Sequence, residues 1–196
     1  MPYTDKASVK TYLDITDADD DDLIDELIDR AQAIIEARTA RVFEWPGAAT
    51  AQTFDALEDT ALDKHGARRD LLFYQVDLCS ITSIVNGDGE TVGASSYVTL
   101  PRNVTPYYGI RLKGSSGLVW EYEDDPEGAI VVTGKWAYSV TAPADIVHAA
   151  VRMAAYLYRQ KDTQQVFEQV MASASGVLQM PSKLPSDIID ILGPYT

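Results

Sequence analysis

The chain has 196 residues, 46% of them hydrophobic, and a formal net charge of −14 at pH 7. This length can bury one good core, with room for a smaller satellite, and no apolar run reaches the roughly 18 residues that a membrane span needs. Residues 1–60 hold 15 acidic and 5 basic residues. A protein that grips DNA is excluded, because it would need a stripe of Lys and Arg against the phosphates.

Cysteine usage and the N-terminal residues indicate where the chain is made. Cys79 is the only cysteine, which excludes an internal disulfide and a zinc site built from cysteines. Residues 1–10 lack both the charged start and the apolar stretch of a signal peptide. We therefore expect synthesis in a reducing host cytoplasm and no association with a membrane.

Two helices are predicted before residue 44. Thr4 is placed to cap the first, which extends to about Leu13 with Val9, Tyr12 and Leu13 facing inward. The second covers residues 20–39, where one apolar stripe recurs at helical spacing: Leu23, Ile24, Leu27, Ile28, Ala31, Ile34 and Ile35. An acidic run precedes it and suits the positive end of its dipole: Asp17, Asp19, Asp20, Asp21 and Asp22.

The middle of the chain has the two-residue period of β-strands. Strands are predicted at residues 71–76, 80–85, 97–100, 109–113, 117–122 and 129–138, with 51–55 as a further candidate. The sequence Asn86-Gly87-Asp88-Gly89 supplies the positive-φ residues of a tight hairpin turn. These strands are enough for a small sandwich or a barrel-like sheet.

A third long helix and a separate tail are predicted after the strands. Pro143 suits the first position of a helix that reaches about Lys161, with a buried stripe of Ile146, Val147, Ala150, Val151, Ala154, Leu157 and Tyr158. Residues 162–183 carry only a weak helical pattern. The tail contains Ile188, Ile189, Ile191 and Leu192, which are too apolar to be left in water and too few to fold alone. We expect the tail to be mobile in the free protein and to bind a groove on a partner.

Together these elements predict an α+β fold. A small helical bundle core, made of the N-terminal helices and the Pro143 helix, carries an inserted antiparallel β subdomain and an extended C-terminal tail. The expected boundaries are residues 1–43 for the N-terminal helices, 44–140 for the β subdomain with its linker, 141–162 for the core helix, and 163–196 for the spacer and docking tail.

No constellation of residues predicts chemistry. A calcium loop that starts at Asp17 would need Gly at its sixth place and Glu at its twelfth, where the chain has Asp22 and Ile28. The glycines of residues 87–93 and 114–117 lack the spacing of a phosphate loop or a nucleophile elbow. His65 and His148 have no evident Cys or Ser partner, and His148 is expected to be packed or hydrogen-bonded. We therefore expect no enzyme activity, no cofactor and no metal.

Four segments in a fixed order resemble a known family. They are DDLIDELIDRAQAIIEARTAR, then CSITSIVNGDGETVGASSYVTL, then AIVVTGKWAY followed by APADIVHAAVRMAAYLYRQKD, and finally LPSDIIDILGPYT. Over nearly the whole length, this series resembles the head–tail connector (adaptor, or head-completion) family of tailed phages. The resemblance implies a ring, typically a dodecamer, beneath the portal in the virion neck. It also implies that the ring extends the DNA channel, lets double-stranded DNA pass without specific binding, and offers a platform to the next neck protein, a stopper or tail-completion protein.

The resemblance also assigns roles to two surfaces. Family members dock on the portal through their C-terminal segment, which corresponds here to residues 184–196: Leu184, Ile188, Ile189, Ile191, Leu192, Pro194 and Tyr195. The acidic run could face the channel or a subunit boundary and repel the duplex, or it could only cap the helix that follows. The alternative function is a small acidic β-sandwich binding module that recognises a carbohydrate or a peptide.

Overall fold

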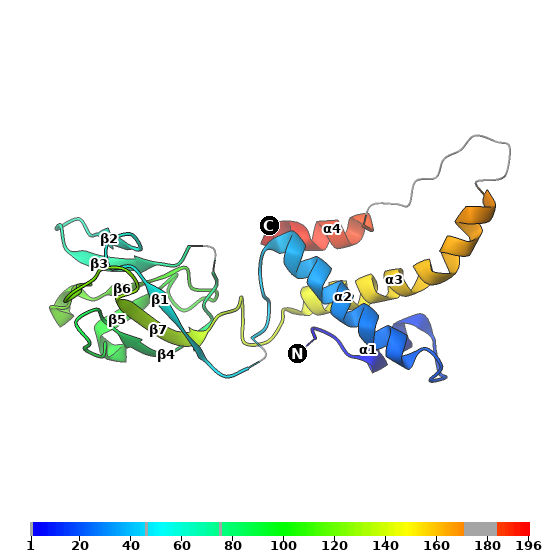
Figure 1. Cartoon of the computed structure of the whole chain (residues 1–196), viewed down its shortest axis with the longest axis horizontal. Helices are drawn as coiled ribbons and strands as arrows, with labels where there is room; N and C mark the ends of the chain where they lie inside the picture. The colour runs from blue at the N-terminus through cyan, green and yellow to red at the C-terminus, as the bar shows by residue number, and fades with distance from the viewer. Residues whose placement is uncertain (1, 46, 75, 171–183) are drawn as a thin grey trace. The chain divides into compact units, whose positions relative to one another are not determined.

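The computed structural model describes residues 2–45, 47–74, 76–170 and 184–196. The chain forms two compact units (Figure 1). Met1–Ala40 and Ala142–Thr196 make the first, which we call the helical unit, and Arg41–Thr141 make the second, which we call the β unit. The predicted α+β class is confirmed. No helix in the described part of the chain is long and apolar enough to cross a membrane.

The helical unit is organised around α3 (Ala144–Val170). The helices α1 (Lys6–Leu13), α2 (Asp21–Thr39) and α4 (Ser186–Leu192) all pack on α3, and a short 3-10 turn, η3 (Gly193–Tyr195), follows α4. α3 runs well past Lys161, where its predicted end lay. Part of the predicted spacer, residues 171–183, lies outside the described residues.

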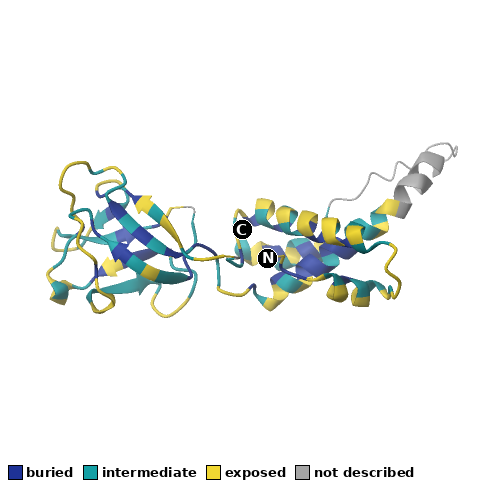
Figure 2. Ribbon diagram, turned by 60° about the horizontal axis from the view of Figure 1, so that its bottom comes forward, coloured by how far each residue is buried: buried dark blue, intermediate teal, exposed yellow. Residues whose placement is uncertain are grey.

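The predicted stripe on α2 is confirmed at its centre. Ile24, Ile28, Ala31 and Ile35 are buried, whereas Leu23, Leu27 and Ile34 are half-buried at its flank. α3 carries small buried residues, Ala149, Ala150, Ala154 and Ala155, and Figure 2 shows the buried residues of the helical unit gathered between its helices. Small side chains let helix axes approach closely, which suits a helix on which three others pack.

The first helix ends at Leu13 as predicted but differs from its prediction in the capping residue and at Tyr12. Asp5, rather than Thr4, caps α1, because its carboxylate accepts a hydrogen bond of 2.7 Å from the Ser8 amide. Val9 is buried as expected, but Tyr12 is 43% exposed. An eight-residue helix that packs on one side has room for few inward side chains, and Tyr12 falls outside that stripe.

The β unit contains two antiparallel sheets. The first has the order β1 (Thr50–Phe54), β7 (Ile130–Lys135), β4 (Ser80–Val85). The second has the order β2 (Thr60–Leu62), β3 (Arg68–Leu72), β6 (Gly109–Leu112), β5 (Tyr97–Leu100). The core includes a cluster of three aromatic rings, Phe54, Phe73 and Trp136, whose centroids are 5.0–5.6 Å apart.

Two strand predictions need correction, and one strand was not predicted. The strand predicted at residues 71–76 is displaced, since β3 ends at Leu72. β2 has only three residues, too few for a visible alternation, and was not predicted. Residues 117–122 are not a strand; the Trp120 side chain of this segment is buried in the core, and its indole N–H donates to the Arg69 carbonyl at 2.9 Å. The turn at Asn86-Gly87-Asp88-Gly89 is present and is closed by the Asn86 amide, which donates to the Glu90 carbonyl at 2.9 Å.

Close contact between β4 and β7 requires glycine at position 134. A Cβ atom there would lie 2.3 Å from the Ser80 carbonyl oxygen and 2.7 Å from a methyl carbon of Leu78. Gly134→Ala should therefore destabilise the β unit by ~1–3 kcal/mol in urea unfolding. Gly93→Ala is the matched control, because its nearest neighbouring atoms lie 4.0 Å away, and it should change stability by less than ~0.5 kcal/mol. Equal stability of the two variants would contradict this packing.

Candidate interaction surfaces

Asp20, in the predicted acidic run, is bound by α3. It precedes α2, and its carboxylate accepts hydrogen bonds from the Tyr158 hydroxyl and the Lys161 ammonium group. Asp20 is the N-cap residue of α2, but its side chain makes no capping hydrogen bond to that helix. The hydrogen bonds from Lys161 and Tyr158 hold the pKa of Asp20 below its ordinary value of 3.8, and the bond from Lys161 has the larger effect. Both bonds favour the charged carboxylate.

Asp21 connects α2 to α1. Its carboxylate lies 2.6 Å from the Lys10 ammonium nitrogen and 3.6 Å from that of Lys6. Lys6 also contacts Asp25 at 2.7 Å, and Lys10 donates to the Asp17 carbonyl. The hydrogen bond from Lys10 lowers the pKa of Asp21. Asp21 is therefore part of the internal framework of the helical unit.

The other three acids of the run are oriented differently. The Asp17 carboxylate accepts a long bond of 3.3 Å from the Asp19 amide. The carboxylates of Asp19 and Asp22 are exposed and make no ion pair with any residue that the structure describes. Asp19 and Asp22 are therefore available for a role outside the helical unit.

The C-terminal tail forms an ordered helix on its own chain. Ile188 and Leu192 are fully buried, Asp187 pairs with Arg152 of α3, and the Tyr195 hydroxyl donates to the Asp145 carboxylate at 2.7 Å. The expectation that all the apolar tail residues await a partner groove is therefore corrected, because α3 already supplies a groove for two of them. The remaining tail residues keep accessible surface: Leu184, Ile189 and Ile191 are half-buried and Pro194 is exposed.

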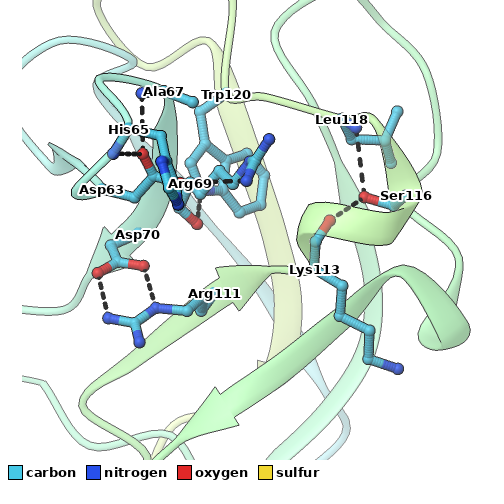
Figure 3. A network of polar contacts seen from close by, with 10 residues as sticks. All are labelled: Asp63, His65, Ala67, Arg69, Asp70, Arg111, Lys113, Ser116, Leu118 and Trp120. Atoms are coloured by element: carbon cyan, nitrogen blue, oxygen red, sulfur yellow. Dashed lines mark hydrogen bonds and ion pairs between the residues drawn. The ribbon is translucent and has the colours of Figure 1, made fainter.

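The densest polar network of the β unit is structural (Figure 3). Asp63 accepts bonds from the His65 and Ala67 amides at 2.8 and 3.0 Å and lies 3.1 Å from the Arg69 guanidinium. The Ala67 bond is the main cause that lowers the pKa of Asp63. Arg111 binds Asp70 through two bonds of 2.5 Å. These contacts fix a hairpin turn and a pair of strands.

The remaining candidates for chemistry are His65, His148 and Cys79. His65 takes part in this network through its backbone, and His148 is exposed on α3 rather than packed. Burial raises the pKa of the Cys79 thiol, which lowers its reactivity. Among the residues that the structure describes, no cluster of His, Cys, Asp and Glu could hold a metal ion.

Similarity to known proteins covers both units. The sequence profile of the head completion protein family (HCP) matches residues 3–196. A chain in the neck of an empty gene transfer agent (GTA) particle, computed with C6 symmetry, is 15% identical with a TM-score of 0.51, covering 100% of this chain and 88% of that one. A chain in the virion of a native GTA particle is 17% identical with a TM-score of 0.41, covering 92% and 79%. The first likeness supports a shared fold, the second is too loose to add to it, and no curated protein matches.

The Asp20 contacts predict a pH-dependent stability. Because the pKa of Asp20 is lowered on folding, the ionised carboxylate stabilises the folded protein above pH 3.8. This stabilisation is lost as the pH falls through the pKa of the folded state. Asp20→Asn should lower the melting temperature at pH 7, by a few degrees at most for an exposed contact. The difference from the parent should shrink as the pH falls below 3.8.

Circular dichroism of the helical signal measures this effect. Asp19→Asn is the matched control, since its carboxylate is exposed, and it should melt like the parent at every pH. A difference for Asp20→Asn that stays constant between pH 7 and pH 2 would show that the carboxylate charge is not the cause.

Proposed function

The chain belongs to the head completion protein family, and from this premise we propose that it is a structural head–tail adaptor of a tailed-phage particle. In this proposal, copies of the chain form a closed ring under the portal in the virion neck. The ring extends the DNA channel and offers a platform to the next neck protein. The observation that carries the proposal is the extent of the family match, residues 3–196, which includes the helical unit, the β unit and the tail.

Other observations support a structural role over a catalytic one. The polar networks of the described residues join elements of the chain to one another. The similar GTA chain belongs to a neck computed with C6 symmetry, and a closed ring of six or twelve copies has that symmetry. The alternative, a carbohydrate- or peptide-binding module, would use the β unit alone and gives no reason for a match that includes the helices.

We propose that α4 binds the portal while it remains seated on α3. Its buried side chains, Ile188 and Leu192, would then hold the helix in place, and the accessible apolar residues of α4 and of the segments on either side of it would contact the portal: Leu184, Ile189, Ile191 and Pro194. This arrangement avoids the entropic cost of ordering a tail at the moment of binding. Repetition around a ring would strengthen a contact that is weak for one copy.

Substitution of accessible and buried residues of α4 tests this docking mode. Ile189→Ser combined with Pro194→Ser should weaken portal binding roughly tenfold, the effect of removing about one isoleucine from a binding interface. Its melting temperature should stay near that of the parent. Ile188→Ser is the matched control, and it should lower the melting temperature because Ile188 is fully buried.

Portal binding is measured with purified portal rings, and function by the fraction of heads that retain DNA. Full portal binding by the Ile189→Ser/Pro194→Ser variant would rule out this surface. Full portal binding by a chain that lacks residues 184–196 would rule out the tail as a whole.

We further propose that the exposed carboxylates of Asp19 and Asp22 face the DNA channel. Fixed negative charge there would repel the duplex and keep it sliding, whereas Lys or Arg would add salt-sensitive affinity and act as a brake. Asp20 and Asp21 are not part of this proposal, because they bind Lys161 and Lys10.

Neutralising the two exposed acids tests the channel role. Asp19→Asn combined with Asp22→Asn should slow DNA ejection at low salt, and the defect should shrink as the salt concentration rises. Glu58→Gln combined with Glu90→Gln changes the net charge equally at exposed positions of the β unit and should leave ejection unchanged. Unaltered ejection by the Asp19/Asp22 variant at low salt would rule out a channel role for this loop.

A further inference from the structure

One end of the β unit presents exposed apolar and basic side chains. Tyr74, Val104 and Tyr108 are 63%, 59% and 55% exposed. Hydrogen bonds bring their segments together: the Phe73 amide donates to the Tyr108 carbonyl at 2.8 Å, and the Tyr108 amide to the Leu100 carbonyl at 2.7 Å. Arg102 is exposed in the same loop. We call Tyr74, Arg102, Val104 and Tyr108 the Tyr–Arg end.

The composition of the Tyr–Arg end is that of a protein interface. Tyr and Arg are enriched among the residues that contribute most to binding between proteins. Residues 97–113 contain no acidic residue, although the chain as a whole has 30 acidic and 16 basic residues. Arg102 makes no ion pair with any residue that the structure describes. The Tyr–Arg end therefore fits a partner surface that is acidic and contains an apolar side chain.

The β unit carries such a surface itself. Glu121, Tyr122, Glu123, Asp124 and Asp125 are all exposed, and we call them the acidic end. Their segment is attached to the turn after β4: the Glu121 amide donates to the Asn86 side chain and the Glu123 amide to the Gly87 carbonyl, both at 3.3 Å. The carboxylates are crowded, since contact with Asp125 raises the pKa of Glu127. A nearby cation would relieve this repulsion.

The two ends lie at opposite ends of the β4–β7 ladder. At one end of the ladder Ser80 pairs with Lys135, and the neighbouring Leu78 pairs with Tyr107, next to the Tyr–Arg end. At the other, Val85 pairs with Val131, and the neighbouring Gly87 pairs with Tyr122 of the acidic end. A strand of this length separates them by about 20 Å. One copy therefore cannot satisfy its own Tyr–Arg end with its own acidic end.

We propose that the Tyr–Arg end of one copy docks on the acidic end of the next copy. The partner is a second copy of this chain, and the contact is heterologous: every copy uses both ends, so the contacts repeat around a closed ring. This inference rests on the proposed ring and specifies which of its surfaces are joined. Arg102 supplies charge opposite the carboxylates, and the exposed tyrosines of both ends supply apolar area.

Reversing the charges tests the pairing, with self-association of the full chain measured by native mass spectrometry and light scattering. Arg102→Glu alone should weaken association at least tenfold, because like charges then meet at every contact. Glu123→Arg combined with Asp124→Arg should also weaken it, because the two introduced arginines cancel the charge of Glu121 and Asp125 and lie opposite Arg102. An equal mixture of the two variants should assemble again, since in alternating copies the introduced glutamate meets the introduced arginines, and the next contact keeps the parent charges on both sides. Lys64→Glu makes the same charge change as Arg102→Glu outside both ends and should leave association intact.

The outcomes separate this inference from the proposed function. Rings that form equally well with Arg102→Glu, or variants that do not recover on mixing, would overturn the pairing and leave the adaptor role standing. A parent chain that stays monomeric even when concentrated would also overturn the pairing. Failure of the parent chain to bind portal rings would instead count against the proposed function.

Discussion

The small-residue face of α3 is the surface on which the helical unit depends. α1, α2 and α4 all pack on this one helix, and its alanines Ala149, Ala150, Ala154 and Ala155 are buried with almost no exposed area. A larger side chain at these positions would force the neighbouring helices apart, and overpacking of this kind costs stability as surely as a cavity does. Because α3 follows the β unit in the sequence, the helical unit is completed only by contacts between distant parts of the chain.

Carboxylates around the packed helices fix the alignment of each helix on its neighbour. Asp20 binds α3, Asp21 binds α1, Asp187 binds Arg152, and Asp145 binds Tyr195. Each exposed bond adds little to stability by itself. Their main effect is on geometry, because each bond can form only when the two segments that it joins pack in one alignment. Part of the chain's large acidic excess is therefore internal framework, and only the exposed remainder, such as Asp19 and Asp22, can act on a partner.

The sequence was most informative where one physical pattern dominated. The α2 stripe predicted a long helix correctly because its apolar residues fall on one face, and Ile28 is buried as that pattern requires, as is Ala154 in the corresponding stripe of α3. Prediction failed where an alternating pattern did not come from a strand. Residues 117–122 alternate as a strand would, yet they lie outside both sheets, with Trp120 buried in the core and its indole N–H bonded to the Arg69 carbonyl.

The candidate surfaces were only partly predictable for the same reason. Sequence can identify Asp20 as an acid at a helix start, but not that Lys161, far away in the chain, binds its carboxylate. It can identify the apolar tail, but not that Ile188 and Leu192 are buried within their own chain. The Tyr–Arg end was not predicted either, because its residues come from two segments that only the fold brings together.

The two connections into the β unit run side by side. The Tyr138 amide donates to the Val42 carbonyl at 2.7 Å, the Ser139 amide to the Phe43 carbonyl at 3.2 Å, and Glu44 pairs with Ser139. The chain thus enters and leaves the β unit at neighbouring positions. A domain with this property can be inserted into another domain with little disturbance. The β unit can therefore be replaced by another domain during evolution while the helical unit is kept.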